Sequence, residues 1–165
     1  MRPARAYIGI GSNLEDPIRQ VRRAFLALNG ILASGCVAQS PLYRTAPVGG
    51  PLGQGDYVNA VAALDTGLTP RQLLLALQTL EIAQGRARSV RWGARTLDLD
   101  LLLYDQLTSD DPRLTLPHPR LHERAFVLYP LRDIAPNLHI PGRGPLIELL
   151  ARCPPQAIAR LDSAD

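Results

Sequence analysis

The chain has 165 residues, of which 46% are hydrophobic and 20% are charged. This composition is typical of a globular protein and excludes a disordered chain, and the length fits one domain over residues 1–165. The net charge is +3, and all 18 basic residues are arginine. The absence of lysine excludes enzymes that depend on the lysine of a phosphate-binding loop, of a protein-kinase strand or of a Schiff base.

Targeting signals and metal-binding cysteine patterns are also missing from the sequence. No apolar run reaches the roughly 20 residues that a membrane-spanning helix needs, and the apolar stretch near the N-terminus is too short for a signal-peptide core. Cys36 and Cys153 do not have the spacing of metal ligands. We therefore expect a cytoplasmic protein.

The chain begins with a strand pattern followed by a helix pattern. Residues 6–13 read as a buried strand, and their G-x-G lacks the third glycine of a dinucleotide-binding loop. Asp16 and Pro17 predict the N-cap and first turn of a helix. Apolar residues at helical spacing follow, and Asn29-Gly30 predicts the end of this helix.

Two further strand patterns lie on either side of a loop. Residues 36–40 and 56–66 have the pattern of strands, and the second places Tyr57 and Asn59 on the same face. Residues 45–55 between them are too rich in glycine and proline for a regular element. Loops of this length inside a compact domain usually carry function.

A second helix is predicted from the capping box Thr69-Pro70-Arg71-Gln72 to Gly85. Its apolar face holds Leu73, Leu74, Leu77 and Leu80. A strand over 96–104 then completes the order β-α-β-β-α-β. This order predicts an α+β fold with a ferredoxin-like core, in which helices pack on an antiparallel sheet in three α-β-α layers.

The last third of the chain contains shorter elements. Prolines on both sides of His118 predict an extended segment, although a lone histidine is more often structural than catalytic. A helix is expected over 121–131, ending near Pro130, followed by a short strand over 138–140 and a last helix over 145–152. No functional role emerges for residues 142–165.

The most informative stretch runs from residue 84 to 104 and joins a cationic loop to a strand with two carboxylates. Asp98 and Asp100 lie about 6.5 Å apart on one face of the strand, where two full charges repel by roughly 2.5 kcal/mol at an effective dielectric of 20. A magnesium ion with substrate phosphates would offset this repulsion. Pairing of the aspartates with nearby arginines would do so as well, and the alternation alone does not decide between the two. The loop arginines are Arg86, Arg88, Arg91 and Arg95.

Six motifs between Tyr7 and Pro141 resemble the 6-hydroxymethyl-7,8-dihydropterin pyrophosphokinase family in order and spacing. They are Y-I-G-I-G-S-N-L, Y-R-T-A-P-V-G, D-Y-V-N-A, E-I-A-Q-G-R, R-W-G-A-R-T-L-D-L-D and L-P-H-P-R-L. The fifth is close to diagnostic. The resemblance implies an enzyme of folate biosynthesis that moves the terminal pyrophosphate of ATP onto the hydroxymethyl oxygen of the pterin and releases AMP. It also implies a monomer with two magnesium ions and no nucleic-acid or membrane partner.

The resemblance also assigns roles to individual residues. Asp98 and Asp100 would hold both magnesium ions, and Arg86 and Arg95 would contact the phosphates when the loops at 46–55 and 86–95 close over the substrates. The implied pterin pocket consists of Thr45, Val48, Tyr57, Asn59, Trp92 and Phe126. The implied ATP contacts are Gln78, Glu81, Arg88, Arg91, Leu101, Arg113, Thr115, His118 and Arg124.

Two other classes of function share some of these features. A ferredoxin-like order and a basic pI also occur in single-stranded RNA binders. Such binders need several aromatic residues on the central strands, and only 5% of this chain is aromatic. A catalytically inactive domain that binds a small molecule is the third possibility, although such a domain has no need for the aspartate pair. Dependence of activity on ATP and magnesium distinguishes the three.

Overall fold

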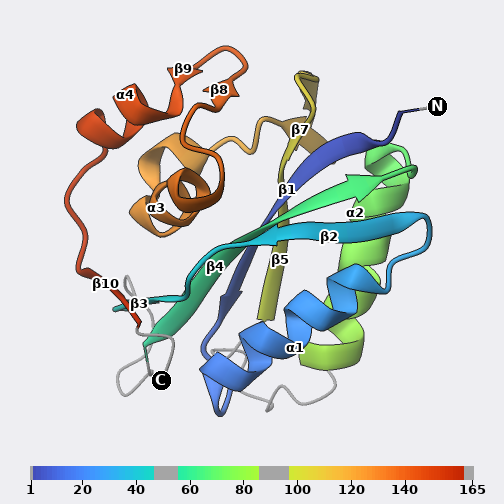
Figure 1. Cartoon of the computed structure of the whole chain (residues 1–165), viewed down its shortest axis with the longest axis horizontal. Coiled ribbons are helices and arrows are strands. Elements are labelled where there is room, and N and C mark those ends of the chain that lie inside the picture. Colours follow the sequence, from blue (N-terminus) through green and yellow to red (C-terminus); the bar gives the residue numbers. More distant parts are fainter. Residues whose placement is uncertain (1, 47–55, 86–96, 162–165) are drawn as a thin grey trace.

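An antiparallel sheet forms the centre of the molecule in a computed structural model that describes residues 2–46, 56–85 and 97–161 (Figure 1). Within these ranges its neighbouring strands are β10 (Ile158–Arg160), β3 (Tyr43–Thr45), β4 (Tyr57–Thr66), β1 (Ala4–Ser12) and β5 (Leu97–Tyr104), and β2 (Ser34–Gln39) pairs with β4 beside β3. Strand β1 pairs antiparallel with both β4 and β5. The predicted α+β fold with an antiparallel sheet is confirmed.

Two helices, α1 (Pro17–Asn29) and α2 (Pro70–Leu80), cover the first face of the sheet. Alternate residues of the strands point to this face, where they meet the apolar stripes of both helices. The first-face core includes Ile8, Ile10, Val21, Phe25, Leu28, Leu73, Leu77, Leu97, Leu99 and Leu101. This layer therefore fixes β5, which carries Asp98 and Asp100, and β1 beside it.

The N-terminal ends of these two helices agree only in part with what the sequence predicts. The capping box forms as predicted, since the Gln72 amide donates to the Thr69 hydroxyl at 3.2 Å and the Thr69 amide donates to the Gln72 side chain at 2.9 Å. The first helix begins with Asp16 at the N-cap position and Pro17 in the first turn, as predicted, but Asp16 makes no capping contact. Its backbone is left-handed, with φ 55°, and its side chain caps no amide of the first turn.

The second helix ends differently from the prediction. It stops at Leu80 and continues as the π-helical turn η1 (Glu81–Gly85) rather than as one α-helix. Of the four leucines expected to be buried, Leu73 and Leu77 are fully buried, whereas Leu74 and Leu80 are only partly covered.

Helices α3 (Ala125–Ile134) and α4 (Leu146–Arg152) lie on the second face, together and away from α1 and α2 (Figure 1). The short helix η3 (Leu121–Glu123) precedes α3, and the strands β8 (His139–Ile140) and β9 (Gly144–Pro145) connect α3 to α4. The second-face core includes Tyr7, Val61, Leu102, Leu121, Val127, Leu128, Leu131, Ile140 and Leu146. The predicted three layers are present.

The expected end of the third helix near Pro130 is wrong, because α3 runs through this proline to Ile134. A proline inside a helix costs roughly 3 kcal/mol, since it cannot donate the regular hydrogen bond. Leu128 and Leu131 are both 0% exposed, and burying each contributes about 1.5–3 kcal/mol. Packing on the sheet thus outweighs the loss.

The sequence patterns did not predict the hairpin of β6 (Ser109–Asp111) and β7 (Leu114–Leu116) or the edge strand β10. After β7 the peptide bond between Leu116 and Pro117 is cis, and the chain bends and turns where an extended segment was expected. The last helix, α4, and the short strand β8 lie within one residue of their predicted bounds. Among the described residues, no helix has the length and apolar character that crossing a membrane requires.

Candidate active site

A cavity of about 720 Å³ lies on the second face, at the end of the sheet beside the start of α3. Strands β1, β3, β4 and β5 form its floor, and α3 and the segment before β10 form its sides. The residues at its wall are Gly9, Ile10, Gly11, Thr45, Ala46, Tyr57, Asn59, Ala60, Asp98, Asp100, Arg124, Phe126, Val127, Pro155, Gln156 and Ala157.

The two carboxylates of β5 both reach this cavity. The strand alternates as predicted, so Leu97, Leu99 and Leu101 enter the first-face core while Asp98 and Asp100 are half-buried on the opposite face. Their neighbours on β1 are glycines, with Gly11 opposite Asp98 and Gly9 opposite Asp100. Because these glycines have no side chains, neighbouring side chains lie close over them: a Cβ atom built on Gly9 would come within 3.3 Å of Leu102, and one built on Gly11 within 2.8 Å of Asn59.

Asp100 lies in an electrostatically unbalanced position. Burial raises the pKa of its carboxyl group, and the nearby Arg124 guanidinium lowers it to a lesser extent. Arg124 Nη1 lies 4.0 Å from Asp100 Oδ2, the outer limit of an ion pair. The arginine thus offsets only part of the cost of burying this charge, and a cation at the carboxylate would offset more of it.

These two carboxylates suit magnesium better than a metal held entirely by protein. Among residues 2–46, 56–85 and 97–161, no group of three or more histidine, cysteine, aspartate or glutamate side chains is arranged to hold a metal. Magnesium is commonly bound by one or two carboxylates, with waters and substrate phosphates as its remaining ligands. Asp98 and Asp100 at the wall of an open cavity fit this pattern.

A polar pair from β3 and β4 lies across the floor from the aspartates. The buried Thr45 hydroxyl donates to Asn59 Oδ1 at 2.8 Å, and Asn59 lies opposite Gly11 on β1. A Cβ atom built on Gly11 would come within 2.8 Å of Asn59 Nδ2. The acceptor end of the amide is therefore bound to Thr45, while its donor end lies over the glycine between Asn59 and Asp98.

Two aromatic rings complete the apolar part of the wall. Tyr57 and Phe126 come from β4 and α3, and both line the cavity. Arg124 lies over the Phe126 ring, with its Cζ atom 5.6 Å from the ring centre. A flat apolar ligand would find aromatic surface here, together with the amide of Asn59.

The positions expected to contact ATP are only partly assembled at this cavity. Arg124 lines it, but six others do not: Gln78, Glu81, Leu101, Arg113, Thr115 and His118. Leu101 is buried in the first-face core. Glu81 Oε2 accepts a hydrogen bond from the Leu99 amide at 2.9 Å, which links η1 to β5 between the two aspartates.

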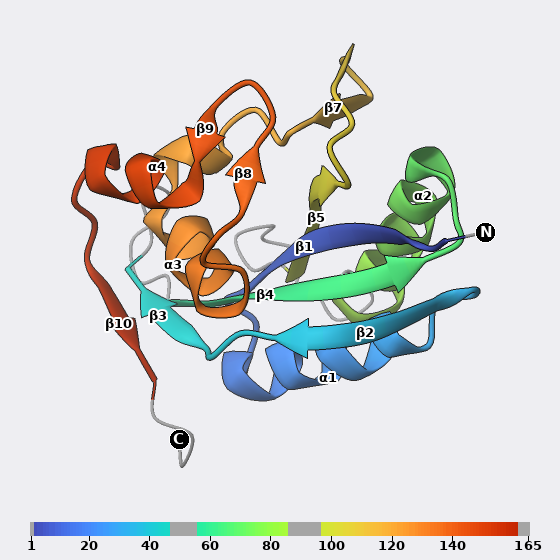
Figure 2. The same ribbon diagram turned by 45° about the horizontal axis from the view of Figure 1, so that its top comes forward.

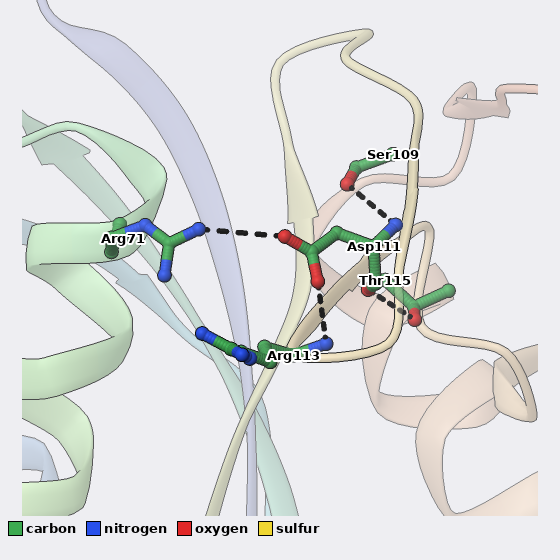
Figure 3. A network of polar contacts seen from close by, with 5 residues as sticks. All are labelled: Arg71, Ser109, Asp111, Arg113 and Thr115. Carbon is green, nitrogen blue, oxygen red and sulfur yellow. Dashed lines mark hydrogen bonds and ion pairs between the residues drawn. The ribbon is translucent and has the colours of Figure 1, made fainter.

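Asp111 organises the hairpin that carries Arg113 and Thr115 (Figure 3). Its Oδ1 accepts from the Arg113 amide at 2.9 Å, and its backbone carbonyl accepts from the Thr115 hydroxyl at 3.0 Å. Its Oδ2 lies 3.4 Å from Arg71 Nη2 on α2. The hairpin is thus held by its own turn and tied to the helix that precedes the cationic loop.

His118 is held in the neutral form. Burial, reinforced by the positive charges of Arg124 and Arg120, lowers the pKa of its imidazole to about 4. The Arg120 amide donates to His118 Nδ1 at 3.2 Å, so the proton of the neutral ring lies on Nε2. At neutral pH this residue can therefore donate one hydrogen bond from Nε2 without adding charge.

Six of the predicted site residues lie outside the described ranges, as do most of the two loops expected to close. They are Val48, Arg86, Arg88, Arg91, Trp92 and Arg95. Conversely, the cavity contains residues that the sequence analysis did not single out, namely Gly9, Gly11, Pro155, Gln156 and Ala157. Glycines at alternate positions inside a strand are a usable signal, because they mark close approach of a ligand or side chain.

A cavity with two carboxylates, aromatic rings and an amide is typical of an enzyme acting on small molecules rather than of an RNA-binding surface. Residues 7–136 match the model of the 7,8-dihydro-6-hydroxymethylpterin-pyrophosphokinase (HPPK) family. The chain therefore belongs to this family. It transfers pyrophosphate to hydroxymethyldihydropterin in folate biosynthesis.

Individual relatives agree with the family match. The chain is 51% identical over 160 residues to the 2-amino-4-hydroxy-6-hydroxymethyldihydropteridine pyrophosphokinase of Pseudomonas aeruginosa. The aligned residues cover 97% of this chain and 98% of the relative. It is 46% identical over 145 residues to the enzyme of the same name from Haemophilus influenzae, covering 88% of this chain and 90% of that one.

The fold is similar to that of HPPK-DHPS from Plasmodium falciparum in a structure with pteroate, with a TM-score of 0.69 at 12% identity. The match covers 92% of this chain and 43% of that chain, so this chain spans less than half of that protein. At this level of identity the likeness concerns the fold.

Proposed function

We propose that Asp98 and Asp100 hold magnesium on the triphosphate of ATP, while the pterin lies between Asn59 and the ring of Phe126. The observation that carries this proposal is that one cavity collects both carboxylates, the Thr45–Asn59 pair and Phe126. The magnesium would supply charge neutralisation of the triphosphate. The enzyme is then a magnesium-dependent diphosphotransferase that uses ATP.

The pterin side is supported by the arrangement of polar and aromatic groups. The Thr45 hydroxyl donates to the amide oxygen of Asn59. The NH2 group of Asn59 is therefore left to donate to an acceptor atom on the edge of the pterin. Tyr57 and Phe126 provide apolar faces for its rings, and Trp92 and Val48 are proposed to complete the pocket. Gly11 leaves room for the Asn59 amide to lie between its own strand and Asp98.

The transfer itself is a displacement at phosphorus. The hydroxymethyl oxygen forms a bond to the β-phosphorus of ATP as the bond from that phosphorus to the bridging oxygen of AMP breaks, and the hydroxyl proton passes to solvent. Reactions of this kind depend on positioning and charge stabilisation more than on covalent participation of the protein. Arg124 is proposed to contribute positive charge beside Asp100, and Arg86 and Arg95 to contribute it from the cationic loop.

The remaining assignments concern the adenosine and phosphate side. The neutral His118, with its proton on Nε2, is proposed to donate to ATP. Supporting contacts are proposed for Gln78, Glu81, Arg88, Arg91, Leu101, Arg113 and Thr115. The resemblance further predicts a monomer, and size-exclusion chromatography with light scattering tests this.

The proposal is tested by measuring AMP formation with ATP, magnesium and 6-hydroxymethyl-7,8-dihydropterin, each omitted in turn, for the wild type and for Asp98→Asn and Asp100→Asn. We expect AMP only when all three are present. Because each substitution removes a charge that holds the metal, each should lower kcat at least about a hundredfold. Pterin affinity without ATP should change little. Wild-type turnover in either variant would refute the metal assignment.

A further inference from the structure

The segment from Cys153 to Ala157, here called the strap, connects α4 to β10 and borders the cavity. Its residues Pro155, Gln156 and Ala157 line the same cavity as Thr45 and Phe126. We propose that the strap is a wall of the pterin subsite and that Gln156 is a positioning residue that holds the start of α3, and with it Phe126. This inference rests on the proposed pterin site and adds to it a part of the chain with no assigned role.

The strap is fixed at its C-terminal end by pairing with the strand that carries Thr45. Strand β10 runs antiparallel to β3, with Ile158 opposite Thr45. One residue beyond β10, the Leu161 amide donates to the Leu42 carbonyl at 2.8 Å. Figure 2 shows the chain descending from α4 to lie beside β3 as β10. The strap is therefore joined directly to the polar side of the pterin subsite.

Gln156 fixes the other side of the strap to α3. Its Oε1 accepts a hydrogen bond from the Ala125 amide at 2.8 Å, and Ala125 is the first residue of the helix. The first amides of a helix lack partners within the helix and need an acceptor from elsewhere. Arg124 stands at the N-cap position and its side chain caps nothing, so Gln156 supplies a cap from a distant part of the chain.

This single hydrogen bond acts on the residue between two groups of the site. Arg124 and Phe126 flank Ala125, and the guanidinium of the first lies over the ring of the second. Loss of the cap frees the first turn of α3, so the ring is held less firmly against the pterin. The hydrogen bond between Gln156 and Ala125 thus couples the position of the strap to that of the Phe126 ring.

The test uses the full-length chain with three variants. Gln156→Met keeps the length and bulk of the side chain but removes the acceptor, and Gln156→Glu restores an acceptor oxygen. The matched control is Gln106→Ala, because Gln106 donates to the His139 carbonyl at 3.2 Å and does not line the cavity. Three quantities are measured: the Kd of the pterin without ATP, the Kd of a non-hydrolysable ATP analogue with magnesium, and hydrogen exchange of the Ala125 amide by NMR.

We expect Gln156→Met to raise the pterin Kd about fivefold to tenfold, the range that loss of one helix cap corresponds to, and to speed exchange at Ala125. The Kd of the ATP analogue should rise less than that of the pterin, since Arg124 is the one proposed phosphate contact next to Ala125 and the other proposed nucleotide contacts come from other elements. Gln156→Glu should restore both pterin affinity and protection of Ala125. Gln106→Ala should leave all three quantities at their wild-type values.

Two results would overturn the inference: unchanged pterin affinity in Gln156→Met despite faster exchange at Ala125, or a Gln156→Glu variant as weak as Gln156→Met. In both cases the pterin Kd of the variant is compared with that of the wild type. If the wild type itself does not bind the pterin, the proposed function has failed. If the wild type binds it and Gln156→Met binds equally well, the strap assignment alone has failed.

Discussion

Gly11 shows how one residue without a side chain shapes the site. It lies in a row across three strands, with Asn59 of β4 on one side and Asp98 of β5 on the other. A methyl group at this position would meet Asn59 Nδ2 at 2.8 Å. The clash involves the end of a side chain rather than backbone, so the fold can accommodate it by moving the Asn59 amide, and binding should change more than stability.

We therefore expect Gly11→Ala to weaken pterin binding by at least about tenfold, the cost of misplacing one buried hydrogen-bonding group. The free energy of unfolding should change by less than about 1 kcal/mol. Pterin titration and urea denaturation measure the two effects. Gly67→Ala is the control, because its nearest non-neighbouring atom would lie 3.5 Å from the new Cβ and it does not line the cavity. A large stability loss with intact pterin affinity would contradict this account of Gly11.

At the scale of elements, the hairpin of β6 and β7 combines two interactions of unequal strength (Figure 3). The Arg71–Asp111 pair has a separation of 3.4 Å, and its side chains are 59% and 42% exposed. Exposed pairs of this kind contribute about 0–1 kcal/mol. The bond from the Arg113 amide to Asp111 Oδ1 is shorter and closes the turn itself. The turn bond, rather than the ion pair, should therefore set the position of Arg113.

This difference predicts how substitutions at Asp111 will behave. Asp111→Ala removes the acceptor of the turn, and we expect the Kd of an ATP analogue to rise about threefold to tenfold. Asp111→Asn keeps an acceptor oxygen and loses only the charge opposite Arg71, so it should bind within about twofold of the wild type. Isothermal titration measures the Kd of the ATP analogue for each variant, and Arg71→Gln is the control for the ion pair. Equal losses in Asp111→Asn and Asp111→Ala would show that the charge is what matters.

Elements with strong local signals were predictable from the sequence. The alternation in β5 placed both aspartates on one face, and the capping box placed the start of α2, because each depends on residues a few positions apart. The extension of α3 through Pro130 was not predictable locally, because burial against the sheet decides it. The three-residue strand β10 was not predictable locally either, because its partner β3 lies far earlier in the chain.

The same distinction holds within the candidate site. The strand period was enough to put Asn59 and Tyr57 on one face, but the Thr45–Asn59 bond joins two strands across a long loop. Gln156 and Ala125 are 31 residues apart, and nothing in their local sequence pairs them. Local pattern thus indicated which residues carry the chemistry, and tertiary structure determined which of them meet.

At the scale of the whole molecule, the two faces of the sheet have different tasks. The first-face core, beneath α1 and α2, supports β1 and β5 from behind. The second-face core, beneath α3 and α4, ends where the cavity begins, and α3 supplies Phe126 to the wall. Damage to either core should cost stability, but only damage to the second should also disturb the pterin subsite.

Leu28 of α1 and Leu128 of α3 allow a matched test, because both are 0% exposed. Truncating either leucine to alanine should lower the free energy of unfolding by about 2–5 kcal/mol. At a temperature where both variants remain folded, Leu128→Ala should raise the pterin Kd by at least about threefold, since it loosens the helix that carries Phe126. Leu28→Ala should bind within about twofold of the wild type. Urea denaturation and pterin titration provide the two quantities, and equal loss of affinity in both variants would mean that binding follows global stability and that the faces are not separate in function.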